Sequence, residues 1–397
     1  MASPIRCVIM RGGTSKAVFL KENDLPTNPA RRKNAILSIF GSPDRRQIDG
    51  LGGADPLTSK LAIIGPPRSD PRAAGTHLTY TFGQVEIDTP KIDFLSLCGN
   101  ISSAVGAFAV YEGLVEATEP ITTVRAYNTN LNRVLTIEVP VKDNRPLERG
   151  DFVVPGVPGT GARILVDFAD TAGAACGALL PTGNSVDRFD IQGVGTIEAS
   201  LVDIGNAHVF IRARDVGLVG TETAAEIDAR GELRDLLERI RGAAAYRMKM
   251  ISNPSRSKPE SPATPILGMV SPPADYRNEI GRGTVNAGEV DIVSRLMFMQ
   301  QMHKTYAGTS TVCTGVASRI SGTIAHEMTR PETRQRDVVR IGHPAGVIDT
   351  ETRVELSGNN YLVRRATLGR TARRIMEGYV YPRDIDDGGH HQDEMSL

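Results

Sequence analysis

The segment 97–115 places a thiol at the start of a predicted helix. Cys98, Gly99 and Asn100 are typical of turns and helix starts, and small and apolar residues then recur at helical spacing up to Gly113. The first turn of a helix carries unpaired N–H groups and the positive end of the helix dipole, which favour a thiolate or a bound carboxylate. Cys98 is therefore a candidate for acid–base chemistry on an anion. The alternative is a cysteine that only packs in the core, since cysteine is often buried.

A second candidate is the lysine that ends a glycine-rich loop. Residues 49–60 read Asp-Gly-Leu-Gly-Gly-Ala-Asp-Pro-Leu-Thr-Ser-Lys and lead into an apolar strand predicted at 61–64. The loop lacks the Gly-Lys-Ser/Thr order and the following helix of a phosphate-binding loop, so it does not indicate a nucleotide site. It brings Lys60 to the edge of a strand, where partial burial favours the neutral amine that acts as a base. The alternative is an exposed lysine that opens a strand.

A third candidate is the N-terminal turn Arg11-Gly12-Gly13-Thr14-Ser15-Lys16, between strands predicted at 5–10 and 17–20. Backbone N–H groups, hydroxyls and cations in one turn can bind a carboxylate together. The alternative is an ordinary hairpin with a glycine-rich tip.

Short strands and a few helices must position these groups. The chain has 397 residues, 40 Gly, 24 Pro and only 5% aromatic residues, which indicates two domains and many tight turns between short strands. A domain boundary is predicted near residue 185, where turn residues cluster. We predict helices at 28–40, 101–112, 221–250 and 290–303, and the predicted strands are 76–89, 92–97, 122–128, 134–141, 151–154, 163–168, 193–202, 209–212, 266–270, 338–347, 353–356 and 361–368.

A second cysteine repeats the first arrangement. Cys313 lies within 309–317, a turn that leads into another helix of small residues. This predicts that the two halves are related copies, each wrapping strands around one helix.

The composition argues against several classes of protein. Basic and acidic residues balance at 46 each and Trp is absent, so a nucleic-acid partner is not expected. The apolar runs are short and broken by Gly or Pro, which indicates neither a signal peptide nor a membrane span. The four cysteines are widely spaced, without a zinc or disulfide pattern, so we expect a cytoplasmic location and no metal or redox cofactor. The polar tail from residue 384, which contains His390 and His391, is expected to be disordered and solvated.

Several segments in a fixed order resemble the PrpF family, which includes 2-methylaconitate cis–trans isomerase, methylitaconate delta-isomerase and 4-oxalomesaconate tautomerase. The resemblance spans nearly the whole chain and is carried by residues 10–16, 49–53 with 58–60, 98–100, 203–206, 302–304, 342–346 and 369–374. Departures from the family pattern are Ala207, where many relatives have proline, and Phe298, where some have serine.

The resemblance implies an α+β fold like that of diaminopimelate epimerase. Two similar domains, here 1–185 and 186–397, would each wrap a barrel-like sheet around a central helix, with the site between them. The family's proton-moving lysine and cysteine fall on Lys60 and Cys98. Substrate contacts are expected from Ser15, Thr58, Ser59, Gly99, Asn100 and His303. Cys313 falls where racemases of the wider fold keep a second thiol.

The expected reaction is a cofactor-independent proton shift across an allylic system in an unsaturated di- or tricarboxylate, such as 2-methylaconitate, aconitate or methylitaconate. A base removes the proton next to a conjugated C=C, and an acid returns one at the same or another carbon. Alternatives are 4-oxalomesaconate tautomerisation, a racemase or epimerase that uses Cys98 and Cys313, and a protein that binds a metabolite without converting it. A homodimer is also expected for a chain of this size.

Overall fold

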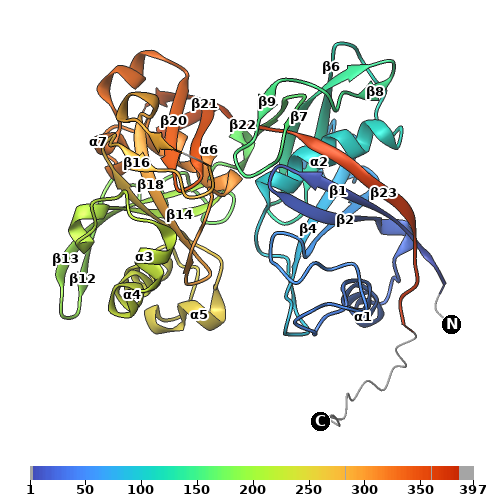
Figure 1. Cartoon of the computed structure of the whole chain (residues 1–397), viewed down its shortest axis with the longest axis horizontal. Helices are drawn as coiled ribbons and strands as arrows, with labels where there is room; N and C mark the ends of the chain where they lie inside the picture. The colour runs from blue at the N-terminus through green and yellow to red at the C-terminus, as the bar shows by residue number, and fades with distance from the viewer. Residues whose placement is uncertain (1–2, 282, 359, 384–397) are drawn as a thin grey trace, which may run out of the picture.

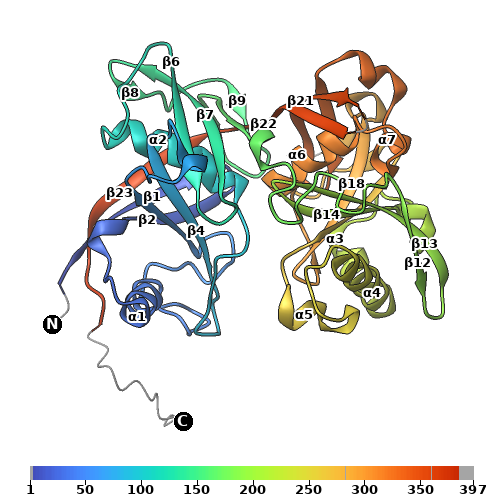
Figure 2. The ribbon, with the colours of Figure 1, turned by 180° about the vertical axis from the view of Figure 1, so that it is seen from behind.

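The computed structural model describes residues 3–281, 283–358 and 360–383, so the polar tail from residue 384 lies outside the described residues. The chain forms two lobes side by side, seen from opposite directions in Figures 1 and 2. The first lobe has six main strands: β1 (Ile5–Gly12), β2 (Ser15–Lys21), β3 (Lys60–Gly65), β4 (Leu78–Val85), β6 (Ile121–Asn128) and β7 (Arg133–Lys142). The second lobe has β13 (Gly195–Ile204), β14 (Asn206–Arg212), β15 (Ile266–Ser271), β18 (Ile292–Phe298), β20 (Val338–His343) and β21 (Gly346–Ser357).

The two sets of six strands pair in the same order and with the same directions. In each set, the five pairings between neighbouring strands are, in order, antiparallel, parallel, antiparallel, parallel and antiparallel. One further strand flanks each set, β23 (Ala372–Val380) beside β1 and β12 (Asp187–Ile191) beside β13. The predicted relation between the two halves is therefore confirmed at the level of sheet topology.

Two strands join the lobes into one continuous sheet. β11 (Ile164–Asp167) pairs with β7 on one side and with β22 (Asn360–Arg370) on the other, and β22 also pairs with β21. The chain then returns to the first lobe, because β23 follows β22 directly and pairs with β1. The division at residues 185 and 186 stays a prediction, and it assigns β23 to the C-terminal part of the chain.

A central helix fills each lobe. These helices are α2 (Gly99–Tyr111) and α6 (Gly308–Ala317). Small residues allow close packing: Gly106 of α2 lies against Ile137 of β7, and Gly315 of α6 lies against Thr350 of β21. Each of these glycines comes seven residues after the first residue of its helix. The two central helices therefore correspond at their first residues and at these glycines.

The remaining elements cover the lobes or form small hairpins. The outer helices are α1 (Pro29–Phe40), α3 (Ala224–Asp228), α4 (Gly231–Arg247), α5 (Ser257–Glu260) and α7 (Ile324–Met328). The short strands are β5 (Ile92–Asp93), β8 (Arg145–Pro146), β9 (Phe152–Val153), β10 (Thr160–Gly161), β16 (Tyr276–Arg277), β17 (Thr284–Val285) and β19 (Gln301–Met302). No helix among the described residues is long and apolar enough to cross a membrane.

The helix predicted at 290–303 is wrong, because this segment forms β18 and β19. The run Ile292–Met297 is buried throughout between β15 and β20, and such a run looks the same in a buried strand as in a buried helix. The predicted strand at 92–97 is only the two residues of β5, and the helix at 221–250 is two helices, α3 and α4. Most of the other predicted elements are confirmed within a few residues.

Candidate active site

The N-termini of the two central helices meet where the lobes join. A Cβ built on Gly99, the first residue of α2, would lie 3.2 Å from the carbonyl carbon of Gly308, the first residue of α6. The residues that precede the helices are Cys98 and Ala307, and neither side chain makes a capping hydrogen bond. The unpaired N–H groups and the positive dipole ends of both helices therefore converge on one place, which suits an anion.

Asn206, at the start of β14, ties the two helix starts together. Its side-chain Nδ2 donates to the carbonyl of Leu97 at 3.3 Å and to Oγ1 of Thr309 at 2.9 Å, and its Oδ1 accepts from the Leu97 N–H at 3.3 Å. One buried amide therefore holds the residue before Cys98 and the first turn of α6 at once. Asn206 lies in a segment of the family resemblance, but it was not among the predicted site residues.

Cys98 is half-buried at the positive end of α2, as predicted. Its carbonyl accepts hydrogen bonds from the N–H and the hydroxyl of Ser102, both at 3.0 Å, so its backbone is fixed while its thiol makes no capping bond. The hydroxyl of Tyr80 is buried without a geometric hydrogen-bond partner in the described part of the chain. Burial raises the pKa of Tyr80, the nearby Cys98 side chain raises it further, and the Ser102 hydroxyl lowers it.

Asn100 links the helix start to the N-terminal turn and to β22. Its Nδ2 donates to Thr14 Oγ1 at 3.0 Å and, at 3.5 Å, to Ser15 Oγ. Its Oδ1 accepts from Nε of Arg370 at 2.7 Å. The turn comes close because Gly13 has φ +49° and a Cβ there would lie 2.3 Å from Asn100 Oδ1. Ser15, Gly99 and Asn100, all predicted at the site, are thus brought together.

Lys60 opens β3 and is buried, in agreement with the prediction that it lies at a strand edge. Its Nζ donates to Gln84 Oε1 at 2.5 Å and lies 5.4 Å from the centre of the Phe82 ring. The Gln84 amide is itself held, because Nε2 donates to the carbonyls of Pro56 and Ser59, both at 3.1 Å. Lys60 has no carboxylate within ion-pair distance among the described residues, so its amine is oriented by a neutral acceptor.

His303 follows β19 in the second lobe and lies near Lys60. Its Nδ1 accepts from the N–H of Thr305 at 3.1 Å, which leaves Nε2 to carry the proton of the neutral ring. Burial lowers the pKa of His303 to about 4, and the charge of Lys60 contributes to the same shift. His303 therefore belongs to the second lobe, lies near Lys60 of the first lobe and carries a neutral imidazole.

The hydroxyls of Thr58 and Ser59 are used within their own loop. Ser59 is fully buried and donates to Gln47 Oε1 at 2.7 Å, while Thr58 donates to the carbonyl of Asp55 at 3.1 Å. These bonds shape the loop that ends at Lys60. Their role in substrate binding stays a prediction.

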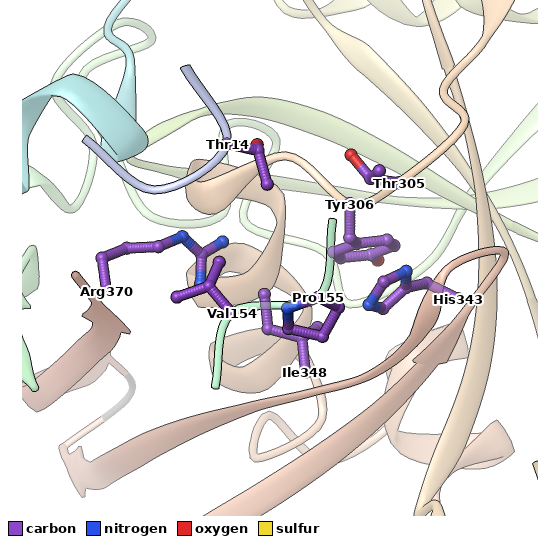
Figure 3. Close-up of a pocket in the computed structure, with 8 residues that line it drawn as sticks. All are labelled: Thr14, Val154, Pro155, Thr305, Tyr306, His343, Ile348 and Arg370. Atoms are coloured by element: carbon purple, nitrogen blue, oxygen red, sulfur yellow. The ribbon is translucent and has the colours of Figure 1, made fainter. Parts of the chain in front are cut away.

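A small pocket lies beside these groups, and Figure 3 shows its lining. The guanidinium of Arg370 and the imidazole of His343 approach from opposite sides, Pro155 and Ile348 lie between them in this view, and the Tyr306 ring lies against His343. Burial lowers the pKa of His343 to about 3, the charges of Arg295 and Arg370 contribute, and His303 lies close enough to act on it as well. His343 is therefore close to both the Arg370 group and the His303 group. Neither Arg370 nor His343 was a predicted site residue, although both lie in segments of the family resemblance.

The expected position of Cys313 at a helix start is wrong. Cys313 lies five residues after Gly308, inside α6, where its counterpart in α2 is Ala104, five residues after Gly99. Its side chain is fully buried, its thiol faces the carbonyl of Val202 at 3.7 Å, and burial raises its pKa. The residue that corresponds to Cys98 is Ala307. The geometry therefore does not favour a two-cysteine racemase or epimerase.

No group of three His, Cys, Asp or Glu side chains close enough to hold a metal ion occurs in the part of the chain that the structure describes. The groups brought together near the helix starts are the thiol, the amine, the buried guanidinium, the neutral imidazoles and the helix N–H groups.

Comparison with known proteins agrees with this architecture. A family model described as "PrpF protein" matches residues 2–383. The chain is 50% identical over 380 residues to 3-methylitaconate isomerase of Eubacterium barkeri. This alignment covers 95% of this chain and 97% of that protein. It is 35% identical to 2-methyl-aconitate isomerase of Shewanella oneidensis, with 95% and 96% of the two chains covered.

Solved structures support the predicted fold. The crystal structure of a methylitaconate-delta-isomerase matches with a TM-score of 0.85 at 48% identity and covers 98% of this chain and 99% of that one. A probable proline racemase from Agrobacterium radiobacter matches with a TM-score of 0.54 at 12% identity, over 96% and 94% of the two chains. The second likeness concerns the fold alone, and it confirms the predicted epimerase-like architecture.

Proposed function

This chain belongs to the PrpF family and is an isomerase, and on this premise we propose that it moves a proton across an allylic system in an unsaturated dicarboxylate of the methylitaconate type. The observation that carries the choice of substrate is the 50% identity, over almost the full length of both chains, to a protein named 3-methylitaconate isomerase. The position of Cys98 beside the meeting helix starts, and of the Lys60 amine near His303 of the second lobe, supports the proposal.

The reaction conserves all atoms and electrons. A base takes the proton from the carbon that bears the methyl and carboxylate groups, and the C–H electron pair enters the conjugated system as a dienolate. The double bond moves inward, and an acid then supplies a proton to the former methylene carbon. The product is an isomer of the substrate.

We assign the two proton transfers to Lys60 and Cys98, and leave open which one removes the proton. Lys60 is buried and held by a neutral amide oxygen, and Cys98 lies at the positive end of α2. Two groups of different acidity can act as base and acid in one turnover.

The weak carbon acid needs stabilisation of the dienolate. The N–H groups of the first turns of α2 and α6 converge at Gly99 and Gly308, and they are fixed before the ligand arrives. Preorganised donors of this kind act most strongly where charge develops during the reaction. The hydroxyls of Thr14 and Ser15, held against Asn100, are a further set of donors.

Proton NMR in D₂O tests the proposal. The purified protein is offered methylitaconate, 2-methylaconitate, trans-aconitate and 4-oxalomesaconate separately, without added metal or cofactor. We expect loss of the allylic proton signal and growth of the isomer with methylitaconate, at a higher rate than with the tricarboxylates. Faster turnover of a tricarboxylate would reject the dicarboxylate assignment, and absence of exchange with all four acids would reject the proposed reaction.

The cytoplasmic location and the homodimer also stay proposals. All four cysteines are free thiols in the structure, which suits a reducing compartment. Sedimentation of the purified protein gives the oligomeric state directly.

A further inference from the structure

We propose that Arg370 and His343 form a subsite that binds one carboxylate group of the substrate, and this inference rests on the proposed function for the identity of that substrate. The two residues come from the ends of β22 and β20, and they face each other across the pocket in Figure 3. Each residue supplies an independent argument for an anionic ligand.

Arg370 is a buried cation that forms no ion pair with any described residue, and Asp349 acts on it only from beyond ion-pair distance. Arg370 is 3% exposed, and no carboxylate among the described residues lies within ion-pair distance of it. Its Nε donates to Asn100 Oδ1 at 2.7 Å and its Nη1 to the carbonyl of Gly369 at 2.8 Å, both neutral acceptors. A buried guanidinium that lacks a counter-charge is costly, and an arriving carboxylate would remove that cost. Arginine also suits a carboxylate because its N–H groups form a planar fork.

His343 supplies an unused donor on the other side of the pocket. It is 2% exposed, and its Nδ1 accepts from the N–H of Ala345 at 3.2 Å. The proton of the neutral ring therefore lies on Nε2, and that buried nitrogen has no hydrogen-bond partner among residues 3–281, 283–358 and 360–383. Buried polar atoms are nearly always bonded, so an unpaired N–H that faces a pocket indicates an acceptor on a ligand.

The pocket has the size and lining for a single small polar group. Its free volume is about 10 Å³, which is room for one water-sized group and not for a whole dicarboxylate. Thr14 and Thr305 also line the pocket, but their hydroxyls contact Asn100 and His303, and the side chains of Val154, Pro155 and Ile348 form the apolar part of the wall. An apolar wall strengthens a charge interaction by excluding water. The rest of the ligand must therefore extend out of the pocket.

Asn100 shows in which direction the ligand extends. Its side chain bonds Arg370 on one side and Thr14 on the other, and it lies two residues after Cys98. A carboxylate on Arg370 would therefore place the adjoining carbons beside the first turn of α2. The subsite would orient the carbon skeleton toward Cys98 without taking part in proton transfer.

Binding of a ligand that cannot react tests the subsite apart from turnover. We would measure the affinity of 2-methylsuccinate and of its two monoamides by calorimetry, for the unmodified protein and for R370Q. We expect R370Q to weaken binding of the dicarboxylate by about 30-fold or more, the range for removal of one partner of a buried charge pair. One monoamide should bind R370Q about as well as the dicarboxylate does. The matched control is R364Q in the same strand, since Arg364 is exposed and bonded to Glu355.

Two further variants keep the test informative if R370Q does not fold. R370K retains the charge without the fork, and H343L removes the donor. We expect each to weaken dicarboxylate binding several-fold, with recovery in H343Q. Unchanged affinity in a folded R370Q, or in both R370K and H343L, would overturn the subsite. Arg370-dependent binding in a protein that isomerises none of the four acids would support the subsite and reject the proposed function.

Discussion

The backbones of Gly99 and Gly308 are in contact: a Cβ on Gly99 would lie 3.2 Å from the carbonyl carbon of Gly308 and equally far from the nitrogen of Thr309. These atoms belong to the backbone and cannot rotate away. The contact brings the starts of two helices from different lobes together, and with them the N–H groups that we assign to the dienolate.

A larger residue at this contact should separate the helix starts. We expect G99V to lower the free energy of unfolding by about 1–3 kcal/mol, the usual cost of overpacking, and to lower turnover at least tenfold. Urea unfolding and the NMR assay measure the two effects. The control is G231A, at the start of α4, where a Cβ would meet no atom within 4 Å. Normal turnover in G99V would show that the close approach of the helices is not needed.

Removal of the Lys60 amine should stop the reaction without unfolding the protein. We expect K60M and K60A to lower kcat by two orders of magnitude or more, the usual size of a general acid–base contribution. K60M keeps the apolar stem beside Phe82, so its circular dichroism and unfolding midpoint should stay close to those of the original protein. K142M, at an exposed lysine that ends β7, is the control. Activity retained in folded K60M would remove Lys60 from the mechanism.

Replacement of Cys98 separates a chemical role from a packing role. We expect C98S and C98A to lower kcat by two orders of magnitude or more. C98S should retain or gain up to about 1 kcal/mol of stability, because serine is a preferred residue before a helix and Cys98 makes no capping bond. Thermal unfolding and single-turnover NMR are the measurements. If instead C98S turned over normally but unfolded more easily, Cys98 would be a packing residue.

The buried cysteine of α6 should be dispensable. C313A removes one sulfur from the core and loses only the weak contact with the carbonyl of Val202. We expect turnover within twofold of the original value and a stability loss of about 1 kcal/mol. A large fall in kcat with stability retained would return the two-cysteine epimerase to consideration, and amino acids would then be the next substrates to test.

The ion-pair cluster around Glu112 predicts a pH dependence of stability. Burial alone would raise the pKa of Glu112, but hydrogen bonds from Arg6, Lys21 and Arg374 outweigh it and lower the pKa from 4.5 to about 2. Since the folded pKa lies below the unfolded one, the stabilisation is present above pH 4.5 and is lost as the pH falls toward 2. We expect E112Q to cost about 3 kcal/mol at pH 7 and progressively less below pH 4.5.

Urea unfolding of E112Q and the original protein at pH 7, 4 and 3 measures this difference. The control is E355Q, since Glu355 pairs with Arg364 at the surface, where such pairs contribute little. An E112Q effect that did not change with pH would contradict the assignment. The cluster also links β1 to β23, which begins two residues after Arg370.

The sequence by itself determined the local features of this protein. The turn at Gly12 and Gly13, the thiol before a helix of small residues and the lysine at the start of a strand are all present as predicted, because each depends on neighbouring residues. The family and the epimerase-like fold also followed from the order of short segments along the chain. Cys313 indicated that the two halves are related, although the residues that correspond in the two central helices are Gly99 and Gly308.

Only the tertiary structure decided which distant residues share the site. The pocket between Arg370 and His343 depends on β20 and β22 ending at the same place, and strand pairing of this kind has no local signal. The same reason explains the error at 290–303, since this mostly apolar segment becomes a buried strand when β15 and β20 lie on both sides of it. Cys313 is the clearest example of what local sequence could not predict. A cysteine near a predicted helix start suggested a catalytic thiol, but α6 begins at Gly308, so Cys313 lies inside the helix and is buried in the core.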